Sequence, residues 1–344
     1  MELNLSPELP QRLLAWYAQS HRDLPWRRDR EPYHIWLSEI MLQQTRVEAV
    51  RGYYARFLQQ LPDISALAQA PEEQLLKLWE GLGYYSRVRN LQKAAKILVE
   101  EYGGAFPDDL ARLRALPGIG DYTAGAIASI CFERPTPAVD GNVLRVVSRL
   151  TACSEPITAI PTKRAVTAAL AAVYPQEGCG LFTQSLMELG ATVCLPNGVP
   201  KCALCPVRTL CEACRSGRQQ SLPVRGEKRA RRQEQRSVLI LQSDGRLALT
   251  RRPTRGLLAG LWQLPDTEGE LSEQQAIDLA EQWGVHVRHL LKTVEKTHIF
   301  THVQWNMKGF YLSCTGQPAQ FIWATREELA EKYALPTAFR QFLD

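Results

Sequence analysis

The residues with the clearest chemical potential are cysteines gathered in one short stretch. In CLPNGVPKCALCPVRTLC, Cys194, Cys202, Cys205 and Cys211 follow a C-x7-C-x2-C-x5-C pattern. Four thiolates this close together can enclose a zinc ion or an iron–sulfur cluster. A structural zinc site usually pairs two C-x2-C knuckles, whereas Cys202 and Cys205 are flanked by longer spacers. The spacing therefore favours an iron–sulfur cluster, and Cys214 is left as a spare thiol or an alternative ligand.

A second candidate is the stretch LPGIGDYTAGA, which places Gly118 and Gly120 between two helix-like runs, DDLARLRAL and DYTAGAIASICF. It lacks the spacing of a nucleotide P-loop, and no strand precedes it. The glycines allow a close approach to the backbone, and the second helix aims its N-terminal amides at an anion. A hairpin between two helices points to a nucleic-acid backbone phosphate, with a plain helix–turn–helix connection as the alternative.

A third feature follows in PAVDGNVLRVVSRL, where Asp140 stands before Gly141 and Asn142 at what reads as a helix start. An aspartate that caps the helix N-terminus is the simplest interpretation of this position. The remaining cysteines, Cys131, Cys153, Cys179 and Cys314, are scattered and are expected to be small core side chains.

The elements that must position these residues change character along the chain. Up to about residue 193, runs such as RVEAVRGYYARFLQQL and LQKAAKILVEEYGG have helical apolar spacing. After residue 236, SVLILQSDGRLALTRR predicts a β-hairpin, LWQLP, HVQWNMKGFYLS and AQFIWAT add strands, and AIDLAEQWG and REELAEKYA predict short helices. The sequence therefore predicts an all-helical domain followed by an α+β domain.

Charge is concentrated between these two regions. The chain has 344 residues and a net charge of +5, and residues 215–236 carry eight Lys or Arg side chains against two acids. This stretch is expected to be a solvated linker, or a basic strap that lies along a polyanion. There is no membrane-length apolar run and no signal-peptide pattern. We therefore expect a cytoplasmic, nucleoid-associated protein without a disulfide framework, because nine cysteines is an odd count.

Together these motifs resemble the helix–hairpin–helix DNA glycosylase superfamily. LPGIGDYTAGAI, VDGNV and the cysteine pattern carry the resemblance, and WLSEIMLQQTRV and GLGYYSRVRNL narrow it to adenine DNA glycosylases of the MutY type. The first cysteine spacer is one residue longer than is usual in the family. The resemblance implies a helical catalytic domain over 1–214 with a [4Fe–4S] cluster, a basic linker over 215–236, and a Nudix-like domain over 237–344.

The resemblance also implies a chemistry. Related bifunctional glycosylases have a lysine where this chain has Tyr122, and a phenol cannot form the imine that leads to strand cleavage. A monofunctional enzyme is expected, with Glu39 as the acid that protonates adenine and then activates water, and Asp140 as the carboxylate beneath the sugar. Burial in an apolar stretch should raise the pKa of Glu39. Tyr122 and Asn142 would hold these groups, and Glu188 is either a supporting carboxylate or an exposed helix glutamate.

The same resemblance suggests DNA contacts. Gln43, Gln44 and Tyr84 lie in motifs similar to the elements that wedge into the duplex when a base is flipped, although Tyr84 has a core position as its alternative. Trp26 and Arg27 are expected to line the site or its approach. RLALTRRPTRGLLAGLWQLP resembles the start of a Nudix-type domain that reads 8-oxoguanine. The contacts to that base are assigned to three adjacent residues, namely Phe300, Thr301 and His302.

The expected partner is double-stranded DNA with adenine opposite 8-oxoguanine or guanine, bound by a monomer that leaves an abasic site for a downstream endonuclease. Three other functions stay open. Tyr122 disfavours a bifunctional glycosylase, and the pair Glu39 and Asp140 disfavours a non-catalytic iron–sulfur DNA sensor. EQQAIDLAEQWGV lacks the glutamate-rich metal-binding helix of a Nudix hydrolase, so recognition rather than hydrolysis is expected of the last domain.

Overall fold

The structure is a computed structural model that describes residues 1–226 and 230–343. Contacts divide the chain into two compact units: Met1–Gln69 with Asn90–Glu227, and Ala70–Arg89 with Lys228–Asp344. The second unit thus takes up a short helical segment from the first part of the sequence. Three residues of the predicted linker, Glu227, Lys228 and Arg229, lie outside the described residues.

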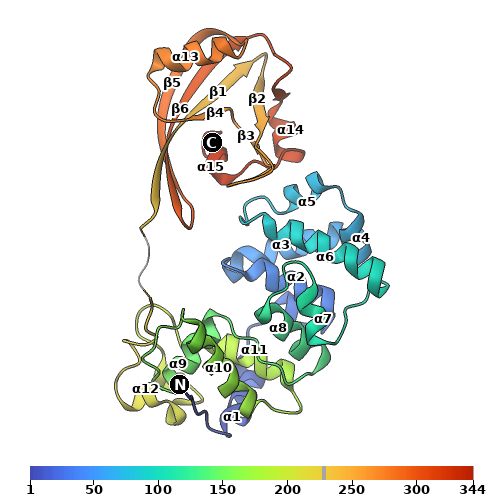
Figure 1. Cartoon of the computed structure of the whole chain (residues 1–344), viewed down its shortest axis with the longest axis vertical. Coiled ribbons are helices and arrows are strands. Elements are labelled where there is room, and N and C mark those ends of the chain that lie inside the picture. The colour runs from blue at the N-terminus through green and yellow to red at the C-terminus, as the bar shows by residue number, and fades with distance from the viewer. Residues whose placement is uncertain (227–229, 344) are drawn as a thin grey trace. The chain divides into compact units, whose positions relative to one another are not determined.

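The first unit is helical, as the sequence predicts (Figure 1). Its α-helices and 3-10 turns in chain order are α1 (Leu9–Ser20), η1 (Pro25–Arg27), α2 (Pro32–Leu42), α3 (Val47–Gln60), α4 (Ile64–Gln69), α7 (Leu110–Ala115), α8 (Asp121–Phe132), α9 (Gly141–Leu150), α10 (Ile160–Val173), α11 (Cys179–Thr192), η2 (Cys202–Leu204), η3 (Arg208–Leu210) and α12 (Glu212–Arg215). Helix α6 (Ser86–Tyr102) runs from the second unit into the first.

The core of the helical unit lies around α8, α9 and α11. Helix α8 is buried from Thr123 to Ile130 and packs against α2, α7 and α11. Helix α11 lies against α9 so closely that a Cβ on Gly190 would come within 2.6 Å of the Asn142 Cβ. Only glycine permits this approach, because real Cβ atoms do not pack at that distance. The contact fixes the N-terminus of α9, where Asp140 stands, against α11.

The second unit is built on a mixed sheet. Its elements are α5 (Glu72–Leu78), β1 (Arg232–Ser243), β2 (Arg246–Arg251), β3 (Trp262–Gln263), β4 (Asp266–Glu268), α13 (Glu273–Gln282), β5 (His286–Ile299), β6 (Val303–Thr315), β7 (Ile322–Ala324), α14 (Arg326–Glu331) and α15 (Thr337–Arg340). Among the described residues the strand order is β3-β2-β1-β6-β5, with β4 beside β1 and β7 beside β2. Strands β1 and β6 are parallel, and β5 and β6 are antiparallel.

Helices cover both faces of this sheet (Figure 1). On one face α13 packs on a core that includes Phe310 and Leu312. On the other face α14 and α15 pack on a core that includes Trp305 and Met307. Because alternate residues of a strand point to opposite faces, one strand, β6, supplies both cores. The predicted hairpin between β1 and β2 is confirmed, with positive φ at Asp244 and Gly245.

Two features differ from the sequence interpretation. Strand β1 begins at Arg232, inside the stretch read as a solvated linker, and Arg236 is buried in an ion pair with Asp266. Its Nε lies 2.6 Å from the Asp266 carboxylate, and its guanidinium lies over the Trp305 ring. A paired arginine that also stacks on an aromatic ring can be buried, so composition alone misplaced the start of the sheet. Strand β5 had no predicted counterpart.

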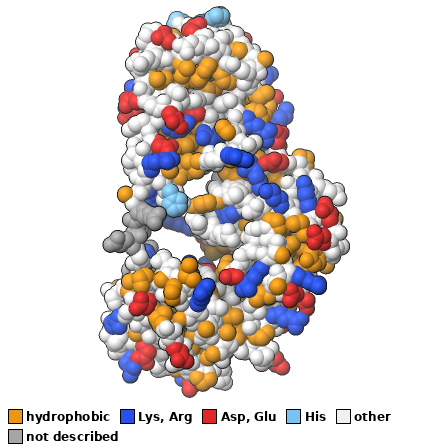
Figure 2. All heavy atoms as spheres, viewed as in Figure 1, with side chains coloured by type: hydrophobic (Ala, Val, Ile, Leu, Met, Phe, Trp, Pro, Cys, Tyr) orange, Lys and Arg blue, Asp and Glu red, His pale blue; other side chains and the backbone are white. Residues whose placement is uncertain are grey.

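The surface is mixed in charge. In the view of Figure 2, acidic and basic side chains are interspersed over the visible face of each unit. A uniform positive field therefore does not cover that face, and contact with a polyanion depends on particular groups.

Among the described residues, each helix is too short or too polar to cross a membrane.

Candidate active site

A cleft of about 830 Å³ opens in the helical unit. Its walls come from η1, α2, α8, α9 and α11, which are far apart in the sequence. The residues predicted for catalysis and base flipping that line it are Trp26, Arg27, Glu39, Gln43, Gln44, Tyr122, Asp140 and Asn142. The fold thus brings together eight predicted residues from four separate motifs, whereas Glu188, Gly118 and Gly120 lie outside the cleft wall.

Glu39 is the most unusual acid in this cleft. It lies on α2, a helix whose other residues from Tyr33 to Met41 are largely buried, and its own exposed fraction is 6%. The phenol of Tyr122 donates a hydrogen bond to the Glu39 carboxylate. Burial is the main cause of a raised pKa at Glu39, and the nearby charge of Asp140 raises it further, whereas the Tyr122 hydrogen bond lowers it. The net result is a pKa of about 7. Glu39 is therefore poised to give or take a proton near neutral pH.

Asp140 has two roles in this geometry. Its Oδ1 accepts a hydrogen bond from the Val143 backbone N–H at 2.8 Å, so it is the N-cap of α9, as the simplest interpretation holds. Its Oδ2 accepts from the Asn142 side-chain amide at 2.7 Å, and the residue also lines the cleft. Burial raises the pKa of Asp140, while these two hydrogen bonds oppose that effect by favouring the carboxylate.

Asn142 is itself held in place. Arg145, one turn further along α9, donates to the Asn142 Oδ1 at 2.8 Å. The same guanidinium donates to the carbonyls of Gly190 and Cys194, each at 2.8 Å. Arg145 is buried, and each of these contacts replaces water for its charge. Its side chain therefore links the N-terminus of α9 to the end of α11 and to the first cysteine of the cluster motif.

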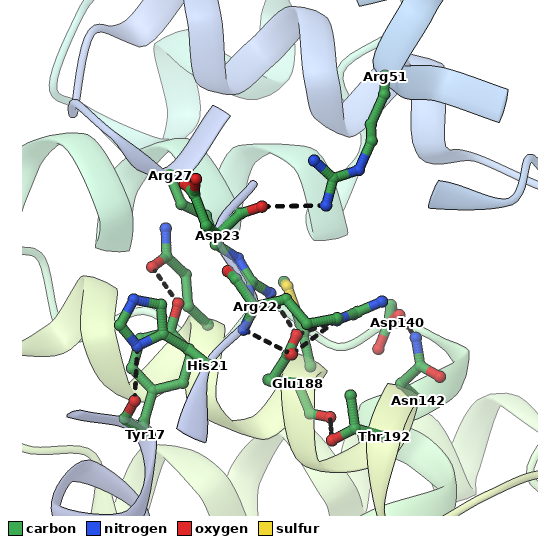
Figure 3. A network of polar contacts seen from close by, with 12 residues as sticks. Tyr17, His21, Arg22, Asp23, Arg27, Arg51, Asp140, Asn142, Glu188 and Thr192 are labelled. Atoms are coloured by element: carbon green, nitrogen blue, oxygen red, sulfur yellow. Dashed lines mark hydrogen bonds and ion pairs between the residues drawn. The ribbon is translucent and has the colours of Figure 1, made fainter. Parts of the chain in front are cut away.

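Glu188 is a buried structural anion rather than an exposed helix residue. It is fully buried on α11 and receives hydrogen bonds from the Arg22 guanidinium at 2.7 and 2.8 Å and from Arg27 at 2.8 Å (Figure 3). Burial raises the pKa of Glu188, but the hydrogen bonds and charges of both arginines outweigh burial and lower it overall. Glu188 therefore stays ionised at neutral pH and fixes Arg27, which lines the cleft.

The helix–hairpin–helix geometry is present between α7 and α8. Gly118 has φ +79°, and a Cβ there would lie 2.8 Å from the Asn90 Cβ, so both conformation and space require glycine. Gly120 is the N-cap residue of α8, and a Cβ there would meet no atom within 4 Å. Packing inside the protein therefore explains why position 118 must be glycine. It gives no such reason for Gly120, which faces open space at the positively polarised N-terminus of α8.

The predicted DNA-contacting residues occupy distinct settings. Gln43 and Gln44 follow the end of α2 and line the cleft, with Gln44 at φ +60°. Trp26, on η1, is buried and meets the Tyr54 ring edge-on at 5.5 Å. Tyr84 lies in the second unit at φ +47° and is 45% exposed, so core packing does not account for it.

Phe300, Thr301 and His302 form the turn between β5 and β6. Phe300 packs against the ring of Trp305 at 4.9 Å, whereas Thr301 and His302 are exposed. Within the second unit, the hydroxyls of Thr301 and Tyr84 share a hydrogen bond. Tyr84 and the three turn residues line one cavity of about 580 Å³. The turn is thus exposed and anchored at one end by an aromatic core contact.

The four predicted metal ligands converge after α11. Cys194, Cys202, Cys205 and Cys211 line one cavity whose wall is mostly apolar. The Arg149 guanidinium donates to the Cys194 Sγ at 3.2 Å. Within the described residues, no three His, Cys, Asp or Glu side chains are grouped tightly enough for a single metal ion. Four thiols that line one apolar cavity are the kind of donor set that an iron–sulfur cluster requires.

Sequence reasoning missed two residues of this site, Arg22 and Arg145. Arg22 pairs with the distant Glu188, and Arg145 binds the distant Gly190 and Cys194 carbonyls in addition to Asn142, so local spacing does not reveal these roles. One signal was available for Arg22: it lies five residues before Arg27, on the other side of Trp26 in the RDLPWRR stretch.

Comparisons with known proteins find relatives of both the helical and the sheet regions of the chain. Residues 37–176 match the family described as HhH-GPD superfamily base excision DNA repair protein, and residues 237–344 match the NUDIX domain. The human adenine DNA glycosylase is 36% identical over 96% of this chain and 73% of its own length, and the mouse protein is 36% identical over 96% and 77%. The Schizosaccharomyces pombe adenine DNA glycosylase is 30% identical over 92% of this chain and 85% of its own.

Solved structures show the same helical fold. A thermostable thymine-DNA glycosylase has a TM-score of 0.53 and 26% identity, and covers 60% of this chain and 95% of its own. An endonuclease III–DNA complex has a TM-score of 0.52 at 24% identity, over 62% of this chain and 98% of its own, which bears on the fold alone. Since the relatives match nearly the whole sequence, the chain belongs to the adenine DNA glycosylase family, within the HhH-GPD superfamily of base excision DNA repair proteins.

Proposed function

We propose that the chain is a monofunctional DNA glycosylase that removes adenine paired with 8-oxoguanine or guanine and leaves an abasic site. The observation that carries this proposal is the arrangement of Glu39, Tyr122 and Asp140 in one cleft. A buried acid with a pKa of about 7 faces a second carboxylate, and the residue that would be the lyase nucleophile is a phenol. Two carboxylates in different environments are what N-glycosidic hydrolysis needs.

In the proposed reaction, Glu39 in its protonated form transfers a proton to N7 of the flipped adenine. Protonation makes the base a better leaving group, and positive charge builds up on the sugar as the C1′–N9 bond breaks. Asp140, ionised and held by Asn142, stabilises that charge or attacks C1′. Glu39, now a carboxylate, takes a proton from the water that attacks C1′, and the abasic sugar is released. Proton balance is restored because Glu39 ends the cycle protonated.

Other residues act through these two. Tyr122 is a neutral donor, since burial and the charges of Glu39 and Asp140 hold the pKa of its phenol well above its usual range. Arg27, fixed by Glu188, brings a positive charge to the cleft wall, where it opposes the raised pKa of Glu39. Glu188 is thus a positioning residue, and its ion pairs support the site from behind.

DNA contact is assigned to groups with open faces. The N-terminus of α8 at Gly120 would bind a backbone phosphate, since a helix N-terminus favours an anion and a Cβ at Gly120 would meet no atom within 4 Å. Gln43, Gln44 and Tyr84 would fill or kink the duplex where the adenine leaves it, and Trp26 would line the path of the flipped base. Flipping costs a few kcal/mol, which contacts of this kind offset.

The sheet unit would read the opposite base. Phe300 anchors the β5–β6 turn, and the exposed Thr301 and His302 offer a hydroxyl and an imidazole to the oxidised guanine. Helix α13 corresponds to the catalytic helix of a Nudix hydrolase. Its glutamates are Glu273 and Glu281, and its last residues, Glu281 and Gln282, are exposed. This supports recognition over pyrophosphate hydrolysis.

Cys194, Cys202, Cys205 and Cys211 would hold a [4Fe–4S] cluster, which when bound supplies a covalent cross-link of the segment after α11 and a redox-capable centre. We further propose a catalytic domain over 1–214 and a Nudix-like domain whose sheet begins at Arg232, inside the stretch 215–236. We also propose a monomeric state and hand-over of the abasic product to an endonuclease.

The proposal is tested with Glu39→Gln and Asp140→Asn, which keep side-chain size and remove one carboxylate each. We expect both variants to bind a duplex with adenine opposite 8-oxoguanine and to lose excision in single-turnover assays. Near-normal excision by either variant would refute its assigned role. Tight binding by the wild-type protein without any excision would favour the DNA-sensor alternative instead.

A further inference from the structure

A fifth cysteine stands beside the cluster motif. Cys211 and Cys214 are spaced C-x2-C, as are Cys202 and Cys205. The stretch therefore contains two overlapping sets of four thiols, one that starts at Cys194 and one that ends at Cys214. Sequence spacing alone does not say whether the fifth thiol reaches the same place.

The structure places the fifth thiol in that cavity. Cys214 lines the same apolar cavity as the four predicted ligands. It lies on the short helix α12, which is anchored by the buried Ala213 and by a hydrogen bond from the Arg215 N–H to the Cys211 carbonyl at 3.0 Å. The backbone of the Cys211–Arg215 turn thus holds Cys214 toward the cavity.

Cys214 contacts two of the four predicted ligands. Its thiol is a hydrogen-bonding partner of the Cys202 thiol, and its backbone N–H hydrogen-bonds to the Cys211 thiol. The interactions of Cys205 include Cys194, Cys202 and Cys211. The direct contact between the two thiols makes Cys214 the neighbour best placed to take the role of Cys202.

Two of the other cysteines, Cys179 and Cys314, are buried and bonded elsewhere. The Cys179 Sγ bonds to the Pro175 carbonyl at 3.1 Å, and the Cys314 Sγ bonds to the Leu312 carbonyl at 3.3 Å in the other unit. They behave as the core side chains that the sequence predicts.

We propose that Cys214 is a reserve ligand of the cluster, able to take the place of Cys202 when that thiolate is lost. The inference rests on the proposed [4Fe–4S] cluster and concerns only which thiols can bind it. In such an exchange the Cys214 thiol would lose its proton to become a thiolate ligand and the departing Cys202 thiolate would take up a proton, so no oxidant or reductant would be consumed. The cluster then keeps four thiolate ligands.

The test compares full-length variants purified without added iron. We expect Cys202→Ala to keep most of its iron and acid-labile sulfide, and Cys202→Ala with Cys214→Ala to lose both. Cys205→Ala is the matched control and should lose its cluster whether or not Cys214 is present. Cys214→Ala alone should keep a full cluster. Visible absorption of each variant reports the cluster independently of excision.

Three results would overturn the inference. If Cys202→Ala is as poor in iron as the double variant, Cys214 is no ligand, although the cluster itself stands. If Cys214→Ala loses iron while Cys194→Ala keeps it, Cys214 belongs to the resident set. If the wild-type protein holds no iron, the proposed cluster fails as well.

A measurement on the wild-type protein avoids any folding defect of the variants. Native holoprotein is treated with iodoacetamide, and the modified peptides are identified by mass spectrometry. A reserve ligand predicts that Cys214 is alkylated while Cys202 is protected, and that both react after a chelator and an oxidant remove the cluster. Protection of Cys214 in the holoprotein would contradict the inference.

Discussion

The hydrogen bond from Tyr122 to Glu39 makes a sharp prediction about pH dependence. Burial raises the pKa of Glu39 to about 7, and the phenol holds it down from a higher value because it stabilises the ionised carboxylate. Tyr122→Phe removes that donor and leaves the ring in place. The pKa of Glu39 should therefore rise, and the acid form should persist to higher pH.

The size of the shift follows from the energy of the bond. A hydrogen bond to a charged group contributes about 1.5–3 kcal/mol, and about 1.4 kcal/mol corresponds to one pKa unit. The neutral form of Glu39 also loses a partner, so we expect a shift of roughly one unit, near the lower end of that range. Because the ionised form cannot protonate adenine, the wild-type excision rate should fall as pH rises through about 7. In Tyr122→Phe the fall should come about one unit higher.

The assay is the single-turnover excision rate, with enzyme in excess over an adenine:8-oxoguanine duplex. It is measured from about pH 5 to about pH 10, a range that spans the pKa of Glu39 and the expected shift. Tyr33→Phe is the matched control, since this buried tyrosine lies on the same helix as Glu39 and its hydroxyl donates to the Leu61 carbonyl at 2.8 Å. It should leave the alkaline limb where it is. An unchanged or lowered limb in Tyr122→Phe would refute the role of the hydrogen bond.

Three further predictions follow from the same geometry. Glu188→Gln should lower the free energy of unfolding by about 3 kcal/mol in urea denaturation, because two arginine side chains lose a buried counter-charge. Gly118→Ala should destabilise the fold by at least ~1 kcal/mol because of its positive φ, whereas Gly120→Ala should keep the melting temperature and weaken DNA binding. Thr301→Ala with His302→Ala should reduce the preference for 8-oxoguanine over guanine by roughly tenfold in relative excision rates.

Each of these has its own control. Glu8→Gln removes an exposed ion pair with Arg12, so it should change stability by less than about 1 kcal/mol. A similar small loss in Glu188→Gln would show that its ion pairs carry little weight. Equal melting temperatures for the two glycine variants would contradict the division between packing and phosphate contact. Unchanged discrimination in the Thr301 and His302 double variant would mean that the turn does not read the opposite base.

Much of the fold and of the cleft was predictable because local motifs carry it. The hairpin glycines, the N-cap Asp140 and the apolar stretch around Glu39 each have a short-range signature, and the cleft follows once their helices pack. The helical and α+β regions were distinguishable because apolar spacing changes from a helical to an alternating pattern after residue 236. The roles assigned to the individual residues remain predictions.

The features that could not be predicted from the sequence depend on residues that are far apart in the chain. The role of Arg145 could not be predicted, because two of its partners, the Gly190 and Cys194 carbonyls, lie more than forty residues away. Strand β5 escaped detection because most of its side chains are exposed and it lacks the alternation of a half-buried strand. Arg236 was assigned to a solvated linker because burial of an arginine requires a partner, here Asp266, that composition does not reveal.

This chain is expected to cut the N-glycosidic bond and to leave the DNA strand intact. A single-turnover reaction of the full-length protein with an adenine:8-oxoguanine duplex, analysed with and without hot alkali, separates these two outcomes. We expect strand breaks only after alkali, because Tyr122 cannot form an imine with the abasic sugar. Strand breaks without alkali would contradict this expectation and would require another nucleophile in the cleft.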